Sequence, residues 1–469
     1  MNASSQHTTA TAGTPLGQLF APVDAASLAV FRVAFGATML WEVVRYFRFG
    51  WITRYYADPV FHFSYFGFGW LPRLSATGLT GLFIVLGVAA VGIALGLCYR
   101  LAAAVFWLGF TYVFLFEAAR YLNHFYLVCL LSLLMAVVPA QRLWSLDAWL
   151  WPKRRGDTVP AWTVWLLRAQ VGIVYVYGGI AKLNADWLAG EPLRSWLASR
   201  VQRGLLPAMF DSEAVVYTIC YGGLLFDLCI VPLLLWRRTR GPAFVLAVLF
   251  HVANSWLFEI GIFPWLMIAA TTLFLSPSWP RRWLSRSPLE HMPVPHIPQR
   301  LTPRQRMTVA LLCAYLAVQL AVPLRHWLYP GNVNWTEQGH RFAWRMKLRS
   351  KRGEARFYVR DPGNGEVWQV DPASFLTGWQ YTQMATEPDM IQQFARHVAN
   401  EFEKAQGNDA SSHVEVRAEV LVSLNGRPPQ LLIDPTVDLT AAPRRLGPSP
   451  WIVPLGQQPT APPPPVPGE

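Results

Sequence analysis

Residues 76–97 read ATGLTGLFIVLGVAAVGIALGL, a stretch without a single charged side chain. A helix needs about 20 mostly apolar residues to cross the ~30 Å hydrocarbon core of a bilayer, so this stretch predicts a membrane span. Comparable stretches recur along the first two thirds of the chain, and charged residues make up only 14% of the 469 residues. A soluble protein of this length would need more charge to cover its surface. The sequence therefore predicts an integral membrane protein.

The predicted architecture is mainly α, with a polytopic transmembrane helix bundle of about nine spans. The seventh and eighth stretches are short and close together, so the count is open by one or two. Abundant Trp, Tyr and Phe suit the aromatic belts at the two membrane surfaces. The predicted spans are residues 25–45, 76–97, 101–118, 124–141, 161–181, 215–236, 241–257, 260–276 and 307–324.

The net charge of +12 invites a nucleic-acid partner, but the basic residues sit mostly in short loops between the predicted spans, which argues against one. If the number of spans is odd, the distribution of Lys and Arg places the N-terminus in the cytosol and the C-terminal domain outside. Residues 1–17 are polar and lack an apolar core, so no signal peptide is predicted. The rich Ala, Arg and Leu usage, together with this missing signal, fits a bacterial inner-membrane protein.

Beyond Pro323 the composition changes to charged and alternating, which predicts a small extramembrane α+β domain of about 100 residues. The expected order is two strands, one amphipathic helix and two more strands. The expected elements are strands at 341–348 and 355–370 (a hairpin turning at 361–365), a helix at 389–404, and strands at 414–424 and 430–433. The predicted domains are a disordered segment 1–20, a helical domain 21–325, an α+β domain 326–456 and a Pro-rich tail 457–469.

Ionisable side chains inside an apolar bundle are costly, so each is a functional candidate. Lys182 lies at the end of the fifth predicted span, where loss of hydration would lower its pKa toward the range of a base. A lysine that reaches out to the membrane surface is the alternative. Gly178 and Gly179, just before it, permit close backbone approach, which suits helix packing and ligand binding equally.

Three further polar groups fall in or beside predicted spans. Asn123 and His124 begin the fourth span, where a hydrogen-bonded surface histidine is the alternative reading. His251 and Asn254 are about one helical turn apart and could share a face, although a hydrogen-bond network between helices is equally compatible. His326 follows the last span, where an ordinary polar junction would also explain it.

The histidines and the five cysteines do not form a convincing metal set, so no metal is predicted. A phosphate-cradling glycine loop and a serine nucleophile motif are also missing from the sequence.

Taken in order, these segments resemble the vitamin K-dependent γ-glutamyl carboxylase family, including its bacterial members with the horizontally transferred transmembrane (HTTM) domain. The resemblance runs from about Ala21 to about Leu455 through short motifs in shared order. These motifs are Pro22-Val-Asp24, Phe61-His62-Phe63, Tyr65-Phe66-Gly67-Phe68, Asn123-His124, Leu167-Arg168-Ala-Gln170, Ala181-Lys-Leu-Asn-Ala-Asp-Trp187, Phe250-His251, Asn254-Ser255, Ile260-Gly261, Trp279-Pro280-Arg281, Asn334-Trp335-Thr336, Trp344 and Ile433-Asp434-Pro435.

The resemblance implies a membrane enzyme that uses reduced vitamin K, O2 and CO2 to carboxylate a glutamyl side chain, with release of the quinone epoxide. Its partners would be membrane lipid, the lipid-soluble quinone and a glutamyl-containing peptide or protein. By the resemblance, Lys182 is the initiating base and His124, with Asn123, stabilises charge during the reaction. By the same resemblance, His251, His326 and Asn254 have supporting roles at the site. Phe263, Trp344 and Met346 would contact the quinone, and Arg349 and Lys351 the glutamate carboxylate.

The sequence also departs from the family. The animal enzymes carry a much longer C-terminal extramembrane region. Where their motif has a pair of lysines, this chain has Ala181-Lys182. Two alternatives therefore stay open. One is a quinone-binding oxidoreductase or epoxidase that does not carboxylate, and the other is a non-catalytic transporter or scaffold.

Overall fold

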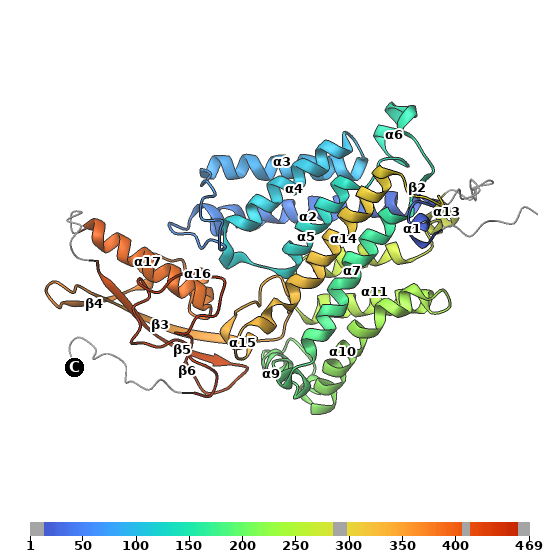
Figure 1. Cartoon of the computed structure of the whole chain (residues 1–469). Helices are drawn as coiled ribbons and strands as arrows, with labels where there is room; N and C mark the ends of the chain where they lie inside the picture. The colour runs from blue at the N-terminus through green and yellow to red at the C-terminus, as the bar shows by residue number, and fades with distance from the viewer. Residues whose placement is uncertain (1–13, 285–297, 406–412, 458–469) are drawn as a thin grey trace, which may run out of the picture.

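The computed structural model describes residues 14–284, 298–405 and 413–457. A bundle of helices forms most of the molecule, and a sheet-containing domain covers one end of that bundle (Figure 1). Most of the predicted N-terminal segment and Pro-rich tail lies outside the described residues. The elements of the bundle are α1 Pro15–Gln18, β1 Pro22–Asp24, α2 Ala26–Arg48, α3 Ala76–Leu95, α4 Tyr99–Phe116, α5 Asn123–Val137, α6 Leu146–Leu150, β2 Thr158–Pro160, α7 Ala161–Lys182, α8 Ala185–Leu188, α9 Leu193–Gln202, α10 Glu213–Leu235, α11 Arg240–Leu257, α12 Phe263–Thr271, α13 Trp279–Leu284 and α14 Pro303–Leu324.

All nine apolar stretches predicted as spans are helical. Six of these helices, α2, α3, α4, α7, α10 and α14, are long and apolar enough to cross a membrane by length and composition. Helix α5 and the segment Phe263–Phe274, which begins with α12, are apolar but shorter. The structure therefore confirms a polytopic helical bundle. Among the described residues, six helices are candidate spans, whereas the sequence predicted about nine.

Small residues let the helices of the bundle approach closely. A Cβ atom on Gly36 of α2 would lie 2.5 Å from the backbone nitrogen of Ala94 in α3. A Cβ on Gly179 of α7 would lie 2.7 Å from Cδ2 and 3.1 Å from the backbone nitrogen of Leu228 in α10. Backbones at such distances pack tightly without a hydrophobic driving force between the helices, as membrane bundles require. The close approach at Gly179 is thus between helices α7 and α10, which is the packing role that its sequence position allowed.

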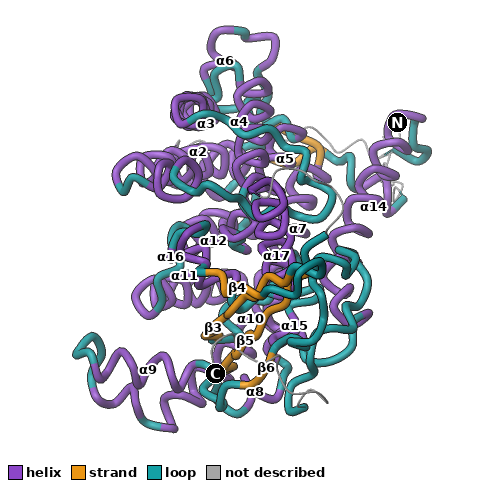
Figure 2. The backbone as a smooth tube through the Cα atoms, turned by 90° about the vertical axis from the view of Figure 1, so that its left-hand side faces the viewer, coloured by secondary structure: helices purple, strands orange, loops and turns teal. Residues whose placement is uncertain are grey.

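The extramembrane domain is a four-stranded antiparallel sheet in the order β4-β3-β5-β6. Helix α17 covers one face of the sheet, where Phe394 packs edge-on against Phe357 of β3 with ring centroids 4.8 Å apart. Figure 2 views the molecule from this domain, with the strands in front of the bundle. The remaining elements are α15 Val333–Thr336, β3 Lys351–Arg360, β4 Val367–Val370, α16 Gly378–Met384, α17 Pro388–Ala405, β5 Glu415–Leu424 and β6 Gln430–Leu431.

This domain confirms the predicted hairpin at 355–370, the helix at 389–404 and the second strand pair, whereas the prediction missed α16. The strand predicted at 341–348 is wrong. The segment is irregular, with left-handed backbone at Phe342, Trp344 and Lys347 (φ +63°, +56° and +55°). The segment packs against the bundle instead of joining the sheet: Trp344 stacks on Tyr126 of α5, with ring centroids 4.9 Å apart.

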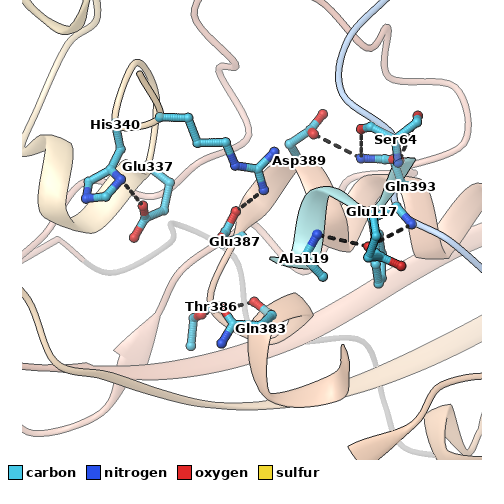
Figure 3. Close-up of polar contacts among 12 residues, drawn as sticks. Ser64, Glu117, Ala119, Glu337, His340, Gln383, Thr386, Glu387, Asp389 and Gln393 are labelled. Atoms are coloured by element: carbon cyan, nitrogen blue, oxygen red, sulfur yellow. Dashed lines mark hydrogen bonds and ion pairs between the residues drawn. The ribbon is translucent and has the colours of Figure 1, made fainter. Parts of the chain in front are cut away.

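Buried polar contacts attach the extramembrane domain to the bundle. The carboxylate of Glu117, which follows α4, is fully buried and lies 2.9 Å from His62 Nδ1. The side-chain amide of Gln380 in α16 donates to the same carboxylate at 3.2 Å. The backbone N–H of Ala119 also donates to it, at 2.9 Å (Figure 3). Because a buried carboxylate without partners is costly, these bonds fix the domain on the bundle end.

Candidate functional site

A cavity of about 320 Å³ lies where α5, α7, α10, α11 and α12 meet the irregular segment before β3. We call this cavity the chamber. Aromatic side chains such as Tyr175, Phe250 and Phe258 form much of its wall. Eight residues singled out from the sequence line it, namely Asn123, His124, Lys182, His251, Asn254, Phe263, Met346 and Arg349.

Lys182 is the last residue of α7 and is buried at the chamber wall. Its ammonium forms an ion pair with the buried carboxylate of Asp227 in α10 and lies 3.4 Å from the carbonyl oxygen of Gly178. The ring of Trp187 lies 5.5 Å from Nζ, within cation–π range. Lys182 therefore turns inward to a protein carboxylate and does not reach out to the membrane surface.

The sequence analysis did not single out Asp227, although a signal was present. Asp227 is the sole charged residue between Ala214 and Leu235, inside a stretch predicted to span the membrane. Gly178 makes room for it, because a Cβ there would lie 3.2 Å from Asp227 Oδ2. The charges of Lys182 and Asp227 thus come from facing positions on two adjacent helices.

His251 of α11 is held by a chain of hydrogen bonds. Its Nε2 lies 2.8 Å from the hydroxyl of Tyr175, and that hydroxyl lies 2.9 Å from Oγ1 of Thr271. Thr271 donates to the carbonyl of Met267, so it accepts from Tyr175, and Tyr175 in turn accepts from Nε2–H. This order of donors leaves Nδ1 of a neutral His251 as an acceptor. Nδ1 is buried and has no partner among the described residues.

Asn123 and His124 open α5 on another side of the chamber. The Asn123 side chain accepts from the Tyr121 hydroxyl at 2.9 Å and donates to the carbonyl of Arg345 at 3.3 Å. The imidazole of His124 packs near the ring of Phe263, with centroids 6.3 Å apart. Asn123 is therefore fixed between the bundle and the irregular segment, with His124 next to it on the chamber.

The structure does not bring three of the predicted residues to the chamber lining. His326 follows α14 and its Nδ1 lies 2.8 Å from the carbonyl of Pro323. Trp344 is fully buried beside Tyr126, and Lys351 donates to the carbonyls of Trp335 and Thr386 at 2.8 and 2.6 Å. These side chains support the walls instead of lining the space.

Arg349 reaches the chamber but already has a carboxylate partner. Its Nη2 donates to Oε2 of buried Glu337 at 2.7 Å, and Lys351 Nζ lies 3.2 Å from Oε1 of the same group. Burial alone would raise the pKa of Glu337, but the charges of Arg349 and Lys351 outweigh it and lower that pKa to about 2. Burial, followed by the charge of Arg349, lowers the pKa of nearby His340 well below its usual value. Glu337 is thus an anion and His340 is neutral at physiological pH.

The end of α7 is tied to the extramembrane sheet just after Lys182. Asp186 accepts from Arg427 Nη1 at 3.0 Å and from the Asn425 side chain at 2.7 Å, both at the β5–β6 turn. Burial alone would raise the pKa of Asp186, but the hydrogen bonds from Arg427 and Asn425 lower it. The ionised link holds the chamber end of α7 against the sheet.

Two family models match the chain. The model described as the HTTM domain matches residues 20–279, and the model described as the vitamin K-dependent gamma-carboxylase, lumenal domain, matches residues 304–458. The first covers the helices that build the chamber, and the second covers α14, the irregular segment and the sheet. No solved structure matches the chain.

Proposed function

Since the chain belongs to the vitamin K-dependent gamma-carboxylase family, we propose that it couples oxidation of a reduced naphthoquinone to CO2 addition at the γ-carbon of peptidyl glutamate. The observation that carries this proposal is the convergence of Lys182, His124 and His251 on one chamber within an apolar bundle. Buried ionisable groups gathered in one cavity are typical of a catalytic site.

The residues of the chamber fit a hydroquinone. Its volume of about 320 Å³ and its aromatic side chains suit a flat apolar ring, and its polar side chains offer hydrogen-bond partners to the two ring hydroxyls. When bound, reduced vitamin K would supply, with O2, the electrons and the strong base needed to remove a γ-proton from glutamate. A carbanion in the chamber would need protection from water until CO2 reaches it, and the apolar helices around the chamber would contribute to that protection.

We assign to Lys182 the removal of a proton from a ring hydroxyl of the bound quinol. A proton that crosses from Nζ to Asp227 leaves Lys182 neutral without changing the net charge of the chamber, and Nζ then accepts the quinol proton. The carboxyl of Asp227 is well placed for this transfer because it contacts Nζ directly. Asp227 is therefore part of the base in this proposal.

His251 and His124 have separate roles in the proposed site. The unpartnered Nδ1 of His251 would accept a hydrogen bond from a substrate hydroxyl, and the Tyr175 hydroxyl would keep the ring in that tautomer. His124, beside Asn123 on α5, would stabilise the negative charge that develops during the reaction.

The proposal extends to location. The chain would lie in a bacterial inner membrane with its N-terminus in the cytosol and the extramembrane domain outside, next to a peptide substrate. The quinone would reach the chamber from the bilayer. This orientation requires an odd number of spans. Because six helices are long enough to span, an odd number of the remaining helices α5, α11 and α12 must also cross the membrane.

The test supplies purified protein with reduced vitamin K, labelled CO2 and a Glu-containing peptide. Labelled peptide and quinone epoxide are expected, and Lys182→Ala should make neither. The proposal fails if wild-type protein yields no product, or if Lys182→Ala matches it.

A second candidate is quinol oxidation to the epoxide without carboxylation. It is favoured by the pairing of Arg349 and Lys351 with Glu337, which leaves neither cation free for a substrate carboxylate. Epoxide would then form with no CO2 incorporation across diverse peptides.

A non-catalytic transporter or scaffold is the remaining alternative. It predicts that neither epoxide nor labelled peptide forms, that no quinone copurifies and that Lys182→Ala leaves function intact.

A further inference from the structure

A second cavity lies on the other side of the irregular segment, with a volume of about 350 Å³. It is bounded by the loop after α2, by the start of α17 and by the C-terminal segment that includes Gly447 and Ser449. Its size is within the range of protein ligand sites. The proposed reaction, as described so far, makes no use of this space.

The partition between the two cavities is one layer of side chains thick. Arg341 and Glu387 form an ion pair, and both side chains line the chamber as well as the second cavity. Beside them, Glu337 lines the second cavity whereas its partner Arg349 lines the chamber. Figure 3 shows the ion-pair contact of the Glu387 carboxylate and, nearby, the His340 ring next to Glu337. Ion pairs therefore lie between the two cavities.

The backbone of this partition is held in an unusual conformation. Phe342, which lines the second cavity, has φ +63°, a left-handed conformation that is unfavourable for a residue with a side chain. Its N–H donates to the hydroxyl of Tyr121 at 2.6 Å, and its ring lies 5.4 Å from the Tyr121 ring on the chamber side. Such backbone persists only where its surroundings fix it, and it gathers at ligand sites.

The charges along the passage favour inward movement of an anion. Arg325, Arg341 and Arg445 face Glu337, Glu387 and Asp389 in the second cavity, so its basic and acidic side chains balance. The chamber has five basic residues against three acidic ones, the basic ones being Lys182, Arg341, Arg345, Lys347 and Arg349. A carboxylate in the second cavity is therefore drawn toward the chamber.

We propose that the second cavity binds the glutamyl-containing peptide and that the substrate carboxylate enters the chamber by replacing Glu387 as the partner of Arg341. The exchange keeps Arg341 paired throughout, while the displaced Glu387 carboxylate stays at the second cavity, which it also lines. The peptide and the lipid-soluble quinone would then reach the chamber by separate routes. This inference rests on the proposed carboxylation.

The first test narrows the second cavity. Gly447 lines it, and a Cβ there would meet only Arg445 Cδ, at 3.9 Å, so side chains fit without backbone strain. Gly447→Trp should lower CO2 incorporation into peptide at least 10-fold, with quinone binding unchanged, whereas Gly378→Trp, at an exposed glycine that lines neither cavity, should behave as wild type. Equal carboxylation by Gly447→Trp and Gly378→Trp, with Ser449→Trp equally active, would overturn the inference.

The second test removes the charge that the substrate replaces. Glu387→Gln frees Arg341, so the KM for the peptide should fall about 5-fold, while a merely structural role of the ion pair predicts a higher KM. An unchanged or raised KM in a folded, quinone-binding variant contradicts the exchange.

A third measurement does not depend on turnover. With the exposed Cys98, Cys229 and Cys313 replaced by alanine, Gly447→Cys offers a thiol at the second cavity. A Glu-containing peptide should slow maleimide labelling of this thiol at least 5-fold, and the matched Gln-containing peptide should not. If wild-type protein makes neither product but the peptide still protects, the proposed reaction fails and the binding site stands. Active wild-type protein without protection refutes the binding site alone.

Discussion

The chamber has two walls of different construction. One wall consists of helices, and its charged pair, Lys182 and Asp227, sits on adjacent helices α7 and α10. The other wall is the irregular segment before β3, where Arg349 shares the carboxylate of Glu337 with Lys351, the first residue of β3. In the helical wall one positive side chain is paired with one negative side chain, whereas the irregular wall has more positive than negative side chains.

The difference follows from the surroundings of each wall. Within an apolar bundle an isolated charge is expensive, so a charged group there needs a partner close by. At the extramembrane end, backbone carbonyls and the domain itself provide further hydrogen-bond partners, as the bonds of Lys351 illustrate. The helical wall therefore holds its charges as a pair, whereas the irregular wall can hold cations in excess of carboxylates.

Removal of the lysine from the helical wall should have the largest effect. Lys182→Ala is expected to lower kcat/KM for quinol oxidation about 1,000-fold, because a positioned base contributes ~10²–10⁴-fold. Steady-state kinetics of the purified protein measure this, with Lys153→Ala at an exposed lysine as the matched control. Retained activity in Lys182→Ala would show that the helical wall does not hold the base.

On the irregular wall, Glu337→Gln should reduce stability by about 3 kcal/mol, because it leaves Arg349 and Lys351 buried without their carboxylate. The folded-state pKa of Glu337 is about 2, below its ordinary value of 4.5. Its contribution is therefore complete above about pH 4.5 and is lost as the pH falls toward 2. Denaturant unfolding at several pH values measures this.

In that experiment the wild type should lose stability relative to Glu337→Gln between pH 4.5 and pH 2. The exposed Glu366→Gln serves as the matched control. Parallel pH curves for wild type and Glu337→Gln would contradict the role of this carboxylate.

Asp227→Asn tests whether the charged pair of the helical wall acts as one unit. A loss of about 50-fold in kcat is expected, since the amide neither stabilises the Lys182 ammonium nor takes its proton. Asp227→Asn combined with Lys182→Ala should then be no slower than Lys182→Ala alone. Additive losses in the double variant would instead separate the roles of the two residues.

The smallest expected effect is at the support of His251. Tyr175→Phe removes the hydroxyl that lies 2.8 Å from His251 Nε2, and a single hydrogen bond contributes about 0.5–1.5 kcal/mol. We expect kcat to fall about 5-fold with KM for the quinol nearly unchanged, whereas Tyr217→Phe on the exposed face of α10 should have no effect. A rise in KM alone would place Tyr175 in binding instead.

The bundle and several chamber residues were predictable because hydrophobicity is a local property. Runs of apolar residues predicted nine of the helices of the bundle, and a lysine or histidine inside such a run stands out on its own. Asp227 could have been found by the same reasoning, as the one acid of its span. The pairing of Asp227 with Lys182 was not predictable, because it depends on how α7 and α10 pack.

The irregular wall was the least predictable part of the molecule. Residues 341–348 alternate like a strand, and nothing in that pattern reveals that Phe342 and Trp344 adopt left-handed backbone against α5. For the same reason Trp344 and Lys351 were predicted to touch ligands but are occupied with packing and carbonyl groups. Tertiary contacts, rather than local pattern, determine this segment.

The link between Asp186 and Arg427 has a consequence for how this molecule can be rearranged. It joins the residues just beyond Lys182 to a turn more than two hundred positions later in the chain. The two parts are therefore not interchangeable modules. A chimera that took its sheet from a relative would need a matching arginine at that turn, or the last turn of α7 would lose its anchor, and with it the alignment of the lysine.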